Sequence, residues 1–174
     1  VEELRVDVEQ KICLDVGAST GGFTEILLEK GAQKIFAVDV GTNQLDWKIR
    51  SDHRVICHEG VNARYIEYNL INQKVDLIVM DVSFISVKQI IPSVRIFSRP
   101  GTEWIILIKP QFEVGKELVG KGGIVADERL HKKVTEEIKQ FCENLGLKCN
   151  ALIKSAVKGT KGNQEYFVWL TTNE

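Results

Sequence analysis

Residues 11–31 read KICLDVGASTGGFTEILLEKG, and this stretch decides the fold. A short apolar run at residues 12–16 leads into a glycine-rich turn, and residues 23–30 then carry apolar side chains at three- and four-residue spacing. This order predicts a strand, a tight turn and a helix, the opening unit of a nucleotide-binding α/β sheet. Because the turn glycines lack a Cβ, a ligand can come close to the free N–H groups at the start of the helix.

The turn departs from the dinucleotide-binding pattern G-x-G-x-x-G, because Ser19 stands two residues after Gly17. The chain instead carries D-x-G-x-x-x-G-G, which begins at Asp15. A carboxylate facing the turn repels a pyrophosphate and suits a ligand with a cationic amino group and no phosphate, such as S-adenosylmethionine (SAM). A second predicted strand, residues 34–38, ends in Asp39, where a carboxylate can bind both hydroxyls of an adenosine ribose. The alternative is a purely structural glycine turn.

The candidate SAM-binding residues fall at the turn, at the start of the first helix and at the ends of the later strands. We expect Asp15 to act through the turn on the amino end of SAM. Asn62 follows the third strand and is a candidate for the adenine edge, although a helix cap explains it equally well. The full set is Asp15, Gly17, Ala18, Ser19, Gly21, Gly22, Phe23, Asp39, Val40, Asn62 and Asp81.

Strand-like and helix-like segments alternate along the rest of the chain. The predicted strands are residues 12–16, 34–38, 54–58, 75–80, 104–108, 148–156 and 165–170. The predicted later helices are residues 43–50, opened by an Asn43 cap, residues 83–97 and residues 127–145. The last two strands are joined by a loop alone, which favours an antiparallel pair at the sheet edge. We therefore expect an α/β, Rossmann-like fold of SAM-dependent methyltransferases, a seven-stranded mostly parallel sheet with a C-terminal antiparallel hairpin and helices on both faces.

Composition sets further limits. The chain has 174 residues, 44% of them hydrophobic and 27% charged, which is enough for one domain with a full core. We expect residues 11–174 to form that domain and residues 1–10 to be the end of an upstream helix or a linker. The net charge of −1 means that nucleic-acid contacts must come from a local basic face or from another part of the protein.

Several classes of protein are disfavoured. No apolar run approaches the roughly 18 residues that span a bilayer, so no membrane contact is expected. The four cysteines form no C-x-x-C pair, which indicates reduced thiols in a cytoplasmic protein. His53, His58 and His131 share no ligand spacing, so we expect surface or capping residues and no metal site.

Charged residues stand at the carboxyl ends of the predicted parallel strands, where ligands bind in such sheets. Asp81 follows the fourth strand and Lys109 follows the fifth. Glu165 begins the last strand, whose reversed direction brings its start to the same edge. We expect these three residues to gather with Asp15 and Asp39 in one crevice.

Two loops carry lysines. Residues 110–126 are rich in glycine and include Lys116 and Lys121, which suggests a flap that meets phosphates rather than a plain surface loop. Between the last two strands, a glycine-containing turn is flanked by lysines that could touch an RNA backbone, with a solvated hairpin loop as the alternative. These lysines are Lys154, Lys158 and Lys161.

The runs DVGASTGGFT, AVDVG, MDVSFIS, LIKPQFEVGKELVGKGGIV and GNQEYFVWL resemble the hemolysin-A (TlyA) type ribosomal RNA 2′-O-methyltransferases of the FtsJ/RrmJ-like superfamily. The resemblance implies a SAM-binding sheet, an N-terminal S4-like RNA-binding domain in cis and a Lys-Asp-Lys-Glu catalytic tetrad. Carried over, the tetrad Asp is Asp81, the second Lys is Lys109 and the Glu is Glu165. The first Lys belongs upstream of the glycine motif, and Lys11 is too close to the first strand to take its place. We thus expect the catalytic domain without its S4-like domain.

The predicted function is transfer of a methyl group from SAM to a ribose 2′-OH of ribosomal RNA, with ribosomal RNA or ribosomal subunits as partner. A ribose hydroxyl must lose its proton as it attacks, and a lysine accepts a proton only when its pKa is lowered by burial or a neighbouring cation. Lys109 is the candidate base, with Asp81 and Glu165 as its supports. The alternatives are a non-catalytic SAM- or RNA-binding scaffold, a hemolysin-like membrane-active protein, and an NAD-dependent oxidoreductase, which Ser19 disfavours.

Overall fold

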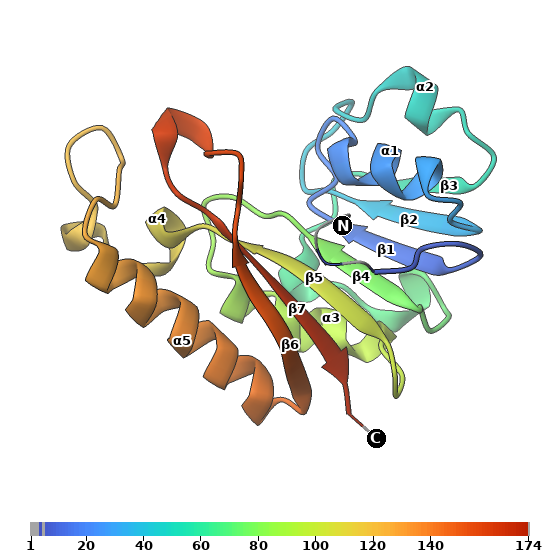
Figure 1. Ribbon diagram of the computed structural model, residues 1–174. Helices are drawn as coiled ribbons and strands as arrows, with labels where there is room; N and C mark the ends of the chain where they lie inside the picture. Colours follow the sequence, from blue (N-terminus) through green and yellow to red (C-terminus); the bar gives the residue numbers. More distant parts are fainter. Residues whose placement is uncertain (1–3, 5, 174) are drawn as a thin grey trace.

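The computed structural model describes residue 4 and residues 6–173, and its centre is a single sheet (Figure 1). Within the described residues this sheet has seven strands, in the order β3-β2-β1-β4-β5-β7-β6. The strands are β1 Ile12–Val16, β2 Lys34–Val38, β3 Val55–His58, β4 Leu77–Met80, β5 Glu103–Ile108, β6 Leu147–Lys154 and β7 Tyr166–Thr172. The first five pair in parallel, and β7 runs antiparallel to both β5 and β6. The predicted fold class is confirmed.

Helices cover both faces of the sheet (Figure 1). They are α1 Gly22–Glu29, α2 Trp47–Arg50, α3 Ile91–Val94, α4 Pro110–Glu113 and α5 Glu128–Asn144. Short 3-10 turns are η1 Ala63–Tyr65, η2 Tyr68–Leu70, η3 Val87–Gln89, η4 Arg95–Phe97, η5 Lys116–Leu118 and η6 Thr160–Gly162. Among the described residues, no helix is both long and apolar enough to cross a bilayer.

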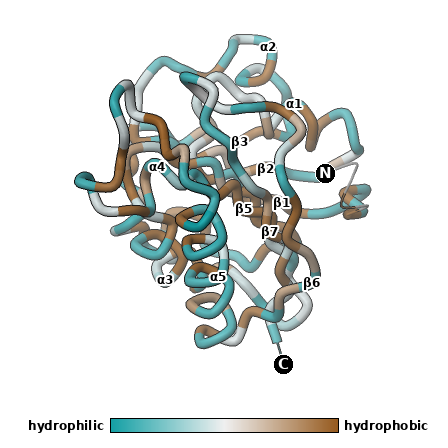
Figure 2. The backbone as a smooth tube through the Cα atoms, turned by 60° about the vertical axis from the view of Figure 1, so that its left-hand side comes forward, coloured by the Kyte–Doolittle hydropathy of each residue, from teal (hydrophilic) through white to brown (hydrophobic). Residues whose placement is uncertain are grey.

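The core forms because strand side chains alternate between the two faces. Leu14 packs in the cluster that includes α3 and α5, whereas Cys13 packs in the cluster that includes α1. Both faces of β1 and β4 are therefore covered, which explains their continuous apolar runs. Figure 2 shows an apolar region around β1 and β5 at the centre of the sheet, beside the mixed polar and apolar surface of α5.

The helix predicted over residues 43–50 forms only in its second half, as α2. Asn43 has a left-handed backbone with φ of 55°, and it precedes α2 rather than capping it. The cap is Asp46, whose carboxylate accepts the N–H of Lys48. The loop before α2 is instead held by Glu59, the residue after β3, which accepts the N–H of Asn43 at 2.8 Å.

The helix predicted over residues 83–97 is broken into η3, α3 and η4. Phe84 adopts a positive φ of 64°, and the Ser86 side chain caps η3 by accepting the N–H of Lys88. Pro92 has no N–H to continue a regular helix from the preceding turn. The apolar side chains after Phe84 are still buried, so the spacing predicted which face packs but not the helix length; they are Val87, Ile90, Ile91 and Val94.

The chain before β1 is not helical where it is described. Residues 6–10 have no helix, and Val6 and Val8 are buried against the α1 side of the sheet. Residues 1–3 and 5, the rest of the predicted upstream segment, lie outside the described residues.

His131 is buried, so of the two predicted roles, surface or capping, the surface role is wrong for this residue. One ring nitrogen lies 3.0 Å from the Tyr166 hydroxyl and the other lies 2.7 Å from the Val125 carbonyl oxygen. The imidazole therefore joins α5 to β7 and to the loop that precedes α5.

Trp104 fastens β5 to the end of β7, and this contact yields a stability prediction. Its buried indole N–H donates to the Thr172 hydroxyl at 2.9 Å. Thr172→Val keeps the shape but removes the acceptor, so we expect the free energy of unfolding to fall by about 1–3 kcal/mol. Urea denaturation followed by tryptophan fluorescence measures the change. The neighbouring Thr171→Val, which loses only an exposed hydrogen bond from Asn150, should cost clearly less, and equal losses would contradict the prediction.

Candidate functional site

A cavity of about 550 Å³ lies at the carboxyl edge of the parallel strands. The strand order reverses between β1 and β4, and this switch point is where open α/β sheets bind ligands. Some of the predicted cofactor residues line the cavity, namely Gly17, Ser19, Asp39, Val40, Asn62 and Asp81. Others lie outside its lining, namely Asp15, Ala18, Gly21, Gly22 and Phe23.

Two positions of the turn require glycine, each for a different structural reason. Gly17 has φ of 84°, and a Cβ there would lie 2.1 Å from the Asp81 carbonyl oxygen. Only glycine lets the β1 turn approach the end of β4 this closely. Gly21, with φ of 107°, caps α1, and a Cβ would lie 2.4 Å from Ile49. The absence of a Cβ at Gly21 therefore lets the start of α1 pack against α2. Phe23, in the first turn of α1, packs edge-on against Phe167.

Asp39 ties the two loops that flank the cavity. Its carboxylate accepts the N–H of Ser19 and the N–H of Gly41, each at 2.7 Å. A carboxylate has further lone pairs, so Asp39 can still accept ribose hydroxyls. The cap considered for Asn62 is present, because its side chain accepts the N–H of Arg64 at the start of η1. The residue also lines the cavity, and contact with an adenine edge stays a prediction.

Glu59 is a supporting residue that the sequence analysis missed. Its carboxylate accepts the N–H groups of Asn43, Gln44 and Leu45 and lies 2.6 Å from Arg50. The Arg50 guanidinium, together with these N–H groups, lowers the pKa of Glu59 to about 2. Because Gln44 lines the cavity, Glu59 fixes one of its walls.

Asp15 is fully buried beneath the turn and faces α1. The Thr24 hydroxyl donates to its Oδ2 at 2.6 Å, while Oδ1 has no hydrogen-bond partner. Burial raises the pKa of Asp15 to about 7, against the opposing effect of the Thr24 hydrogen bond. Asp15 therefore lies behind the turn and does not line the cavity, and its expected action on SAM through the turn stays a prediction.

The raised pKa of Asp15 predicts a pH dependence of stability. The unfolded carboxyl ionises near pH 3.8 and the folded one near pH 7, so the folded state holds the extra proton between these values. The free energy of unfolding of the wild-type protein should fall with rising pH in this window, relative to Asp15→Asn, by up to about 1.4 kcal/mol per pH unit. Urea denaturation of both proteins across this range measures the difference. Parallel pH profiles would contradict the raised pKa.

Lys109, Asp81 and Ser83 form a cluster at the edge of the cavity. The Lys109 Nζ lies 2.5 Å from Asp81 Oδ1 and donates to the Ser83 hydroxyl at 3.0 Å. Only 13% of the Lys109 side chain is exposed, so its amine is held rather than free in solvent. Ser83 is not among the residues predicted for the site, although it stands two residues after Asp81.

Glu165 directly precedes β7, the strand that pairs with β5. The β5–β7 register pairs Ile108 with Tyr166, so Lys109 and Glu165 follow as the next opposed pair. Burial raises the pKa of Glu165, while a hydrogen bond from Gln111 Nε2 at 3.3 Å and the Lys109 charge act in the opposite direction. The three predicted catalytic residues are thus brought to one edge of the sheet.

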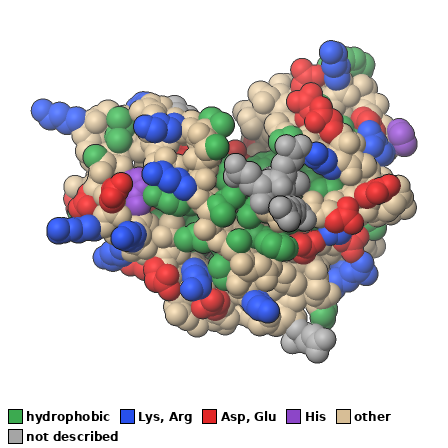
Figure 3. All heavy atoms as spheres, viewed as in Figure 1, with side chains coloured by type: hydrophobic (Ala, Val, Ile, Leu, Met, Phe, Trp, Pro, Cys, Tyr) green, Lys and Arg blue, Asp and Glu red, His purple; other side chains and the backbone are tan. Residues whose placement is uncertain are grey.

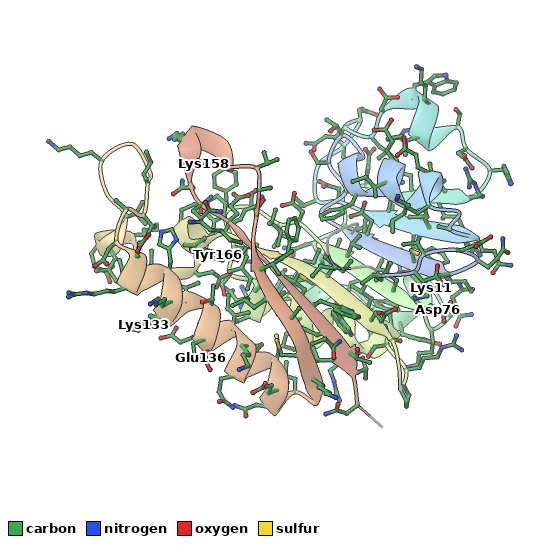
Figure 4. All side chains as sticks on the ribbon, viewed as in Figure 1. Lys11, Asp76, Lys133, Glu136, Lys158 and Tyr166 are labelled. Atoms are coloured by element: carbon green, nitrogen blue, oxygen red, sulfur yellow. The ribbon has the colours of Figure 1, made fainter. Side chains whose placement is uncertain are left out.

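Lys11 lies at the opposite end of the strands, where its Nζ is 2.5 Å from Glu103. Figure 4 shows Lys11 and Asp76 far from Lys158 and Tyr166, which mark the side of the candidate site. This position agrees with the expectation that Lys11 cannot supply the first tetrad lysine.

Two loops join beside Glu165 and form a unit that we call the two-loop lobe, residues 115–126 and 156–164 (Figure 1). Asn163 connects them by accepting the Val125 N–H at 3.1 Å and donating to the Gly123 carbonyl at 2.8 Å. Gly159 packs directly on the Glu165 carboxylate. In Figure 3 the surface is notched between this lobe and the part that carries α1 and α2. The exposed lysines of the lobe are Lys116, Lys121, Lys158 and Lys161.

Phe84 is the most exposed large apolar residue of the site. Its side chain lines the cavity and is 90% exposed, and its ring centroid lies 5.0 Å from that of Phe112. Phe84 falls within the helix predicted over residues 83–97, but its backbone has a positive φ of 64° and its side chain is exposed.

The fold and the glycine turn at the switch point define a SAM-dependent methyltransferase fold. The solved structure of Aeropyrum pernix fibrillarin in complex with natively bound SAM has this fold, with a TM-score of 0.66 at 16% identity over 95% of this chain and 69% of that one.

The chain belongs to the FtsJ-like methyltransferase family, which matches residues 1–172. It is 42% identical to the 16S/23S rRNA (cytidine-2′-O)-methyltransferase TlyA of Mycobacterium tuberculosis, over 99% of this chain and 64% of that protein. It is 45% identical to Hemolysin A of Brachyspira hyodysenteriae, over 94% of this chain and 69% of that protein. A solved structure from Streptococcus thermophilus, provisionally named a hemolysin, has a TM-score of 0.95 at 40% identity over 99% of this chain and 63% of that one. The chain thus spans about two thirds of the length of these relatives.

Proposed function

We propose that this protein transfers the methyl group of SAM to a ribose 2′-OH of ribosomal RNA. The observation that carries the proposal is the Lys109 amine, held by Asp81 and Ser83 at the edge of a cavity formed by the glycine turn. The rRNA 2′-O-methyltransferase relatives support the choice of substrate. The sheet edge thus combines a place for a methyl donor with a candidate base.

The residues present fit SAM. A cavity of about 550 Å³ is in the range that holds a small ligand. Asp39 offers carboxylate oxygens to the ribose, Asn62 offers a side-chain amide, and Val40 offers an apolar surface to the adenine. Because Gly17 has no Cβ, the turn can lie against the end of β4 and form this side of the cavity. When bound, SAM supplies an electrophilic methyl group.

Lys109 would act as the base in its neutral amine form, which has two N–H groups and one lone pair. The Ser83 hydroxyl accepts one N–H group and the Asp81 carboxylate lies 2.5 Å from Nζ, so the amine is held from two sides and its lone pair can take the proton of the attacking 2′-hydroxyl. Glu165, opposite Lys109, would stabilise the ammonium that results. Holding the hydroxyl in line with the methyl group supplies much of the remaining rate.

RNA would lie across the two-loop lobe and the mouth of the cavity. Four exposed lysines on the lobe can neutralise phosphates next to Glu165. The exposed ring of Phe84 offers a flat surface on which a base can stack. Because the net charge is only −1, we further propose that an S4-like domain in cis adds RNA contacts and the first lysine of the tetrad.

The decisive test is tritiated methyl transfer from SAM to ribosomal subunits by the full-length protein. Lys109→Met should lower the rate by at least about 100-fold, because a positioned general base contributes that much. SAM affinity, measured by calorimetry, should change little. The matched control is Lys133→Met on the outer face of α5 (Figure 4), which should keep the wild-type rate. Full activity of Lys109→Met would remove the mechanism, and SAM binding without any methyl transfer by the wild-type protein would favour the scaffold alternative.

The exposed lysines of the two-loop lobe lead to a separate prediction about RNA affinity. Replacing both Lys158 and Lys161 by Gln should weaken binding to ribosomal RNA and reduce the slope of log affinity against log salt by about 2, because each phosphate contact contributes about 1. Filter binding at several salt concentrations measures both values. The double variant of Lys133 and Lys139 on α5 removes the same charge and serves as control. Equal salt slopes for the two double variants would place the RNA elsewhere.

A further inference from the structure

We propose that Glu113 is a positioning residue that orients Lys109 by fixing the loop after β4, residues 82–87. The inference rests on the proposed function and extends it to a residue outside the tetrad. Glu113 ends α4, four residues after Lys109, and its carboxylate meets that loop. Neither the cavity lining nor the two-loop lobe includes it.

Both carboxylate oxygens of Glu113 are used by the loop. Oε2 accepts the Ser86 hydroxyl at 2.6 Å, and Oε1 accepts the Val87 N–H at 2.8 Å. The carboxylate is partly buried, and burial raises its pKa. Hydrogen bonds to a partly buried carboxylate are worth more than exposed ones, so these two contacts hold the loop firmly.

The same loop holds the amine of the candidate base. Ser83, three residues before Ser86, accepts a hydrogen bond from Lys109 at 3.0 Å. Between these two contacts, Phe84 packs on Phe112, which precedes Glu113. The loop after β4 and the segment from Lys109 to Glu113 are therefore joined at three successive points.

The loop needs this support because its backbone is strained. Phe84 has φ of 64°, and a bulky residue adopts a positive φ only when the surrounding structure imposes it. If the Glu113 contacts are removed, the loop can relax and Ser83 can withdraw from Lys109. The amine then loses the hydroxyl that accepts its hydrogen bond, and its lone pair is no longer directed at a single point.

The test compares Glu113→Ala and Ser83→Ala, singly and together, with Glu136→Ala as the matched control on the exposed face of α5 (Figure 4). In methyl transfer to ribosomal subunits by the full-length protein, we expect Glu113→Ala to lower kcat by about tenfold or more, since misplacement of a reacting group has effects of this size. KM and SAM affinity should stay within about twofold, because Glu113 lies outside the cavity. If Glu113 acts through Ser83, the double variant should lose little more than either single variant.

A second measurement does not depend on methyl transfer. The rate at which acetic anhydride modifies Lys109, followed by peptide mass spectrometry at one fixed pH, should change by about threefold or more in Glu113→Ala and in the milder Ser86→Ala, and not in Glu136→Ala. Wild-type kcat together with wild-type Lys109 reactivity in both variants would overturn the inference. Additive losses in the double variant would also overturn it. A wild-type protein without methyl transfer would refute the proposed function alone, and the reactivity of Lys109 would still decide the role of Glu113.

Discussion

The close contact between the turn at Gly17 and the end of β4 is the constraint on which the site depends. A side chain at Gly17 would collide with the Asp81 carbonyl, so the missing Cβ allows β1 and β4 to end side by side. The cavity opens at this point, and Asp81 follows β4 directly and lies next to Lys109 at the end of β5. One backbone contact thus brings the cavity and the candidate catalytic cluster to the same edge.

Carboxylates set the shape of the rim around this contact, and they do so by accepting backbone N–H groups. Asp39 joins the first two loops, Glu59 holds the loop before α2, and Glu113 holds the loop after β4. At Glu59 the Arg50 guanidinium and the N–H donors lower the pKa, whereas burial raises the pKa of Glu113. Asp15 differs from all three, because it is fully buried, accepts one hydrogen bond from a side chain and has its pKa raised to about 7.

The sequence could predict the sheet and the meeting of Asp81, Lys109 and Glu165, because strand direction alone places strand ends at one edge. It could not predict contacts between residues far apart in the chain. Glu113 and Ser86 are 27 residues apart, and no local pattern connects them. The same reason explains the errors at Asn43, where a distant carboxylate competes with a helix cap, and in the helix expected over residues 83–97, where a strained Phe84 interrupts the spacing.

The position of β7 has a consequence for how the site is completed during synthesis. β7 lies between β5 and β6 in the sheet although it follows both in the chain, so one edge of β5 stays unpaired until β7 is made. An open apolar edge invites pairing with other chains. Glu165 precedes this strand directly and reaches its position opposite Lys109 only when the strand inserts. Closing the exposed edge of β5 and completing the candidate catalytic cluster therefore happen together when β7 is added to the sheet.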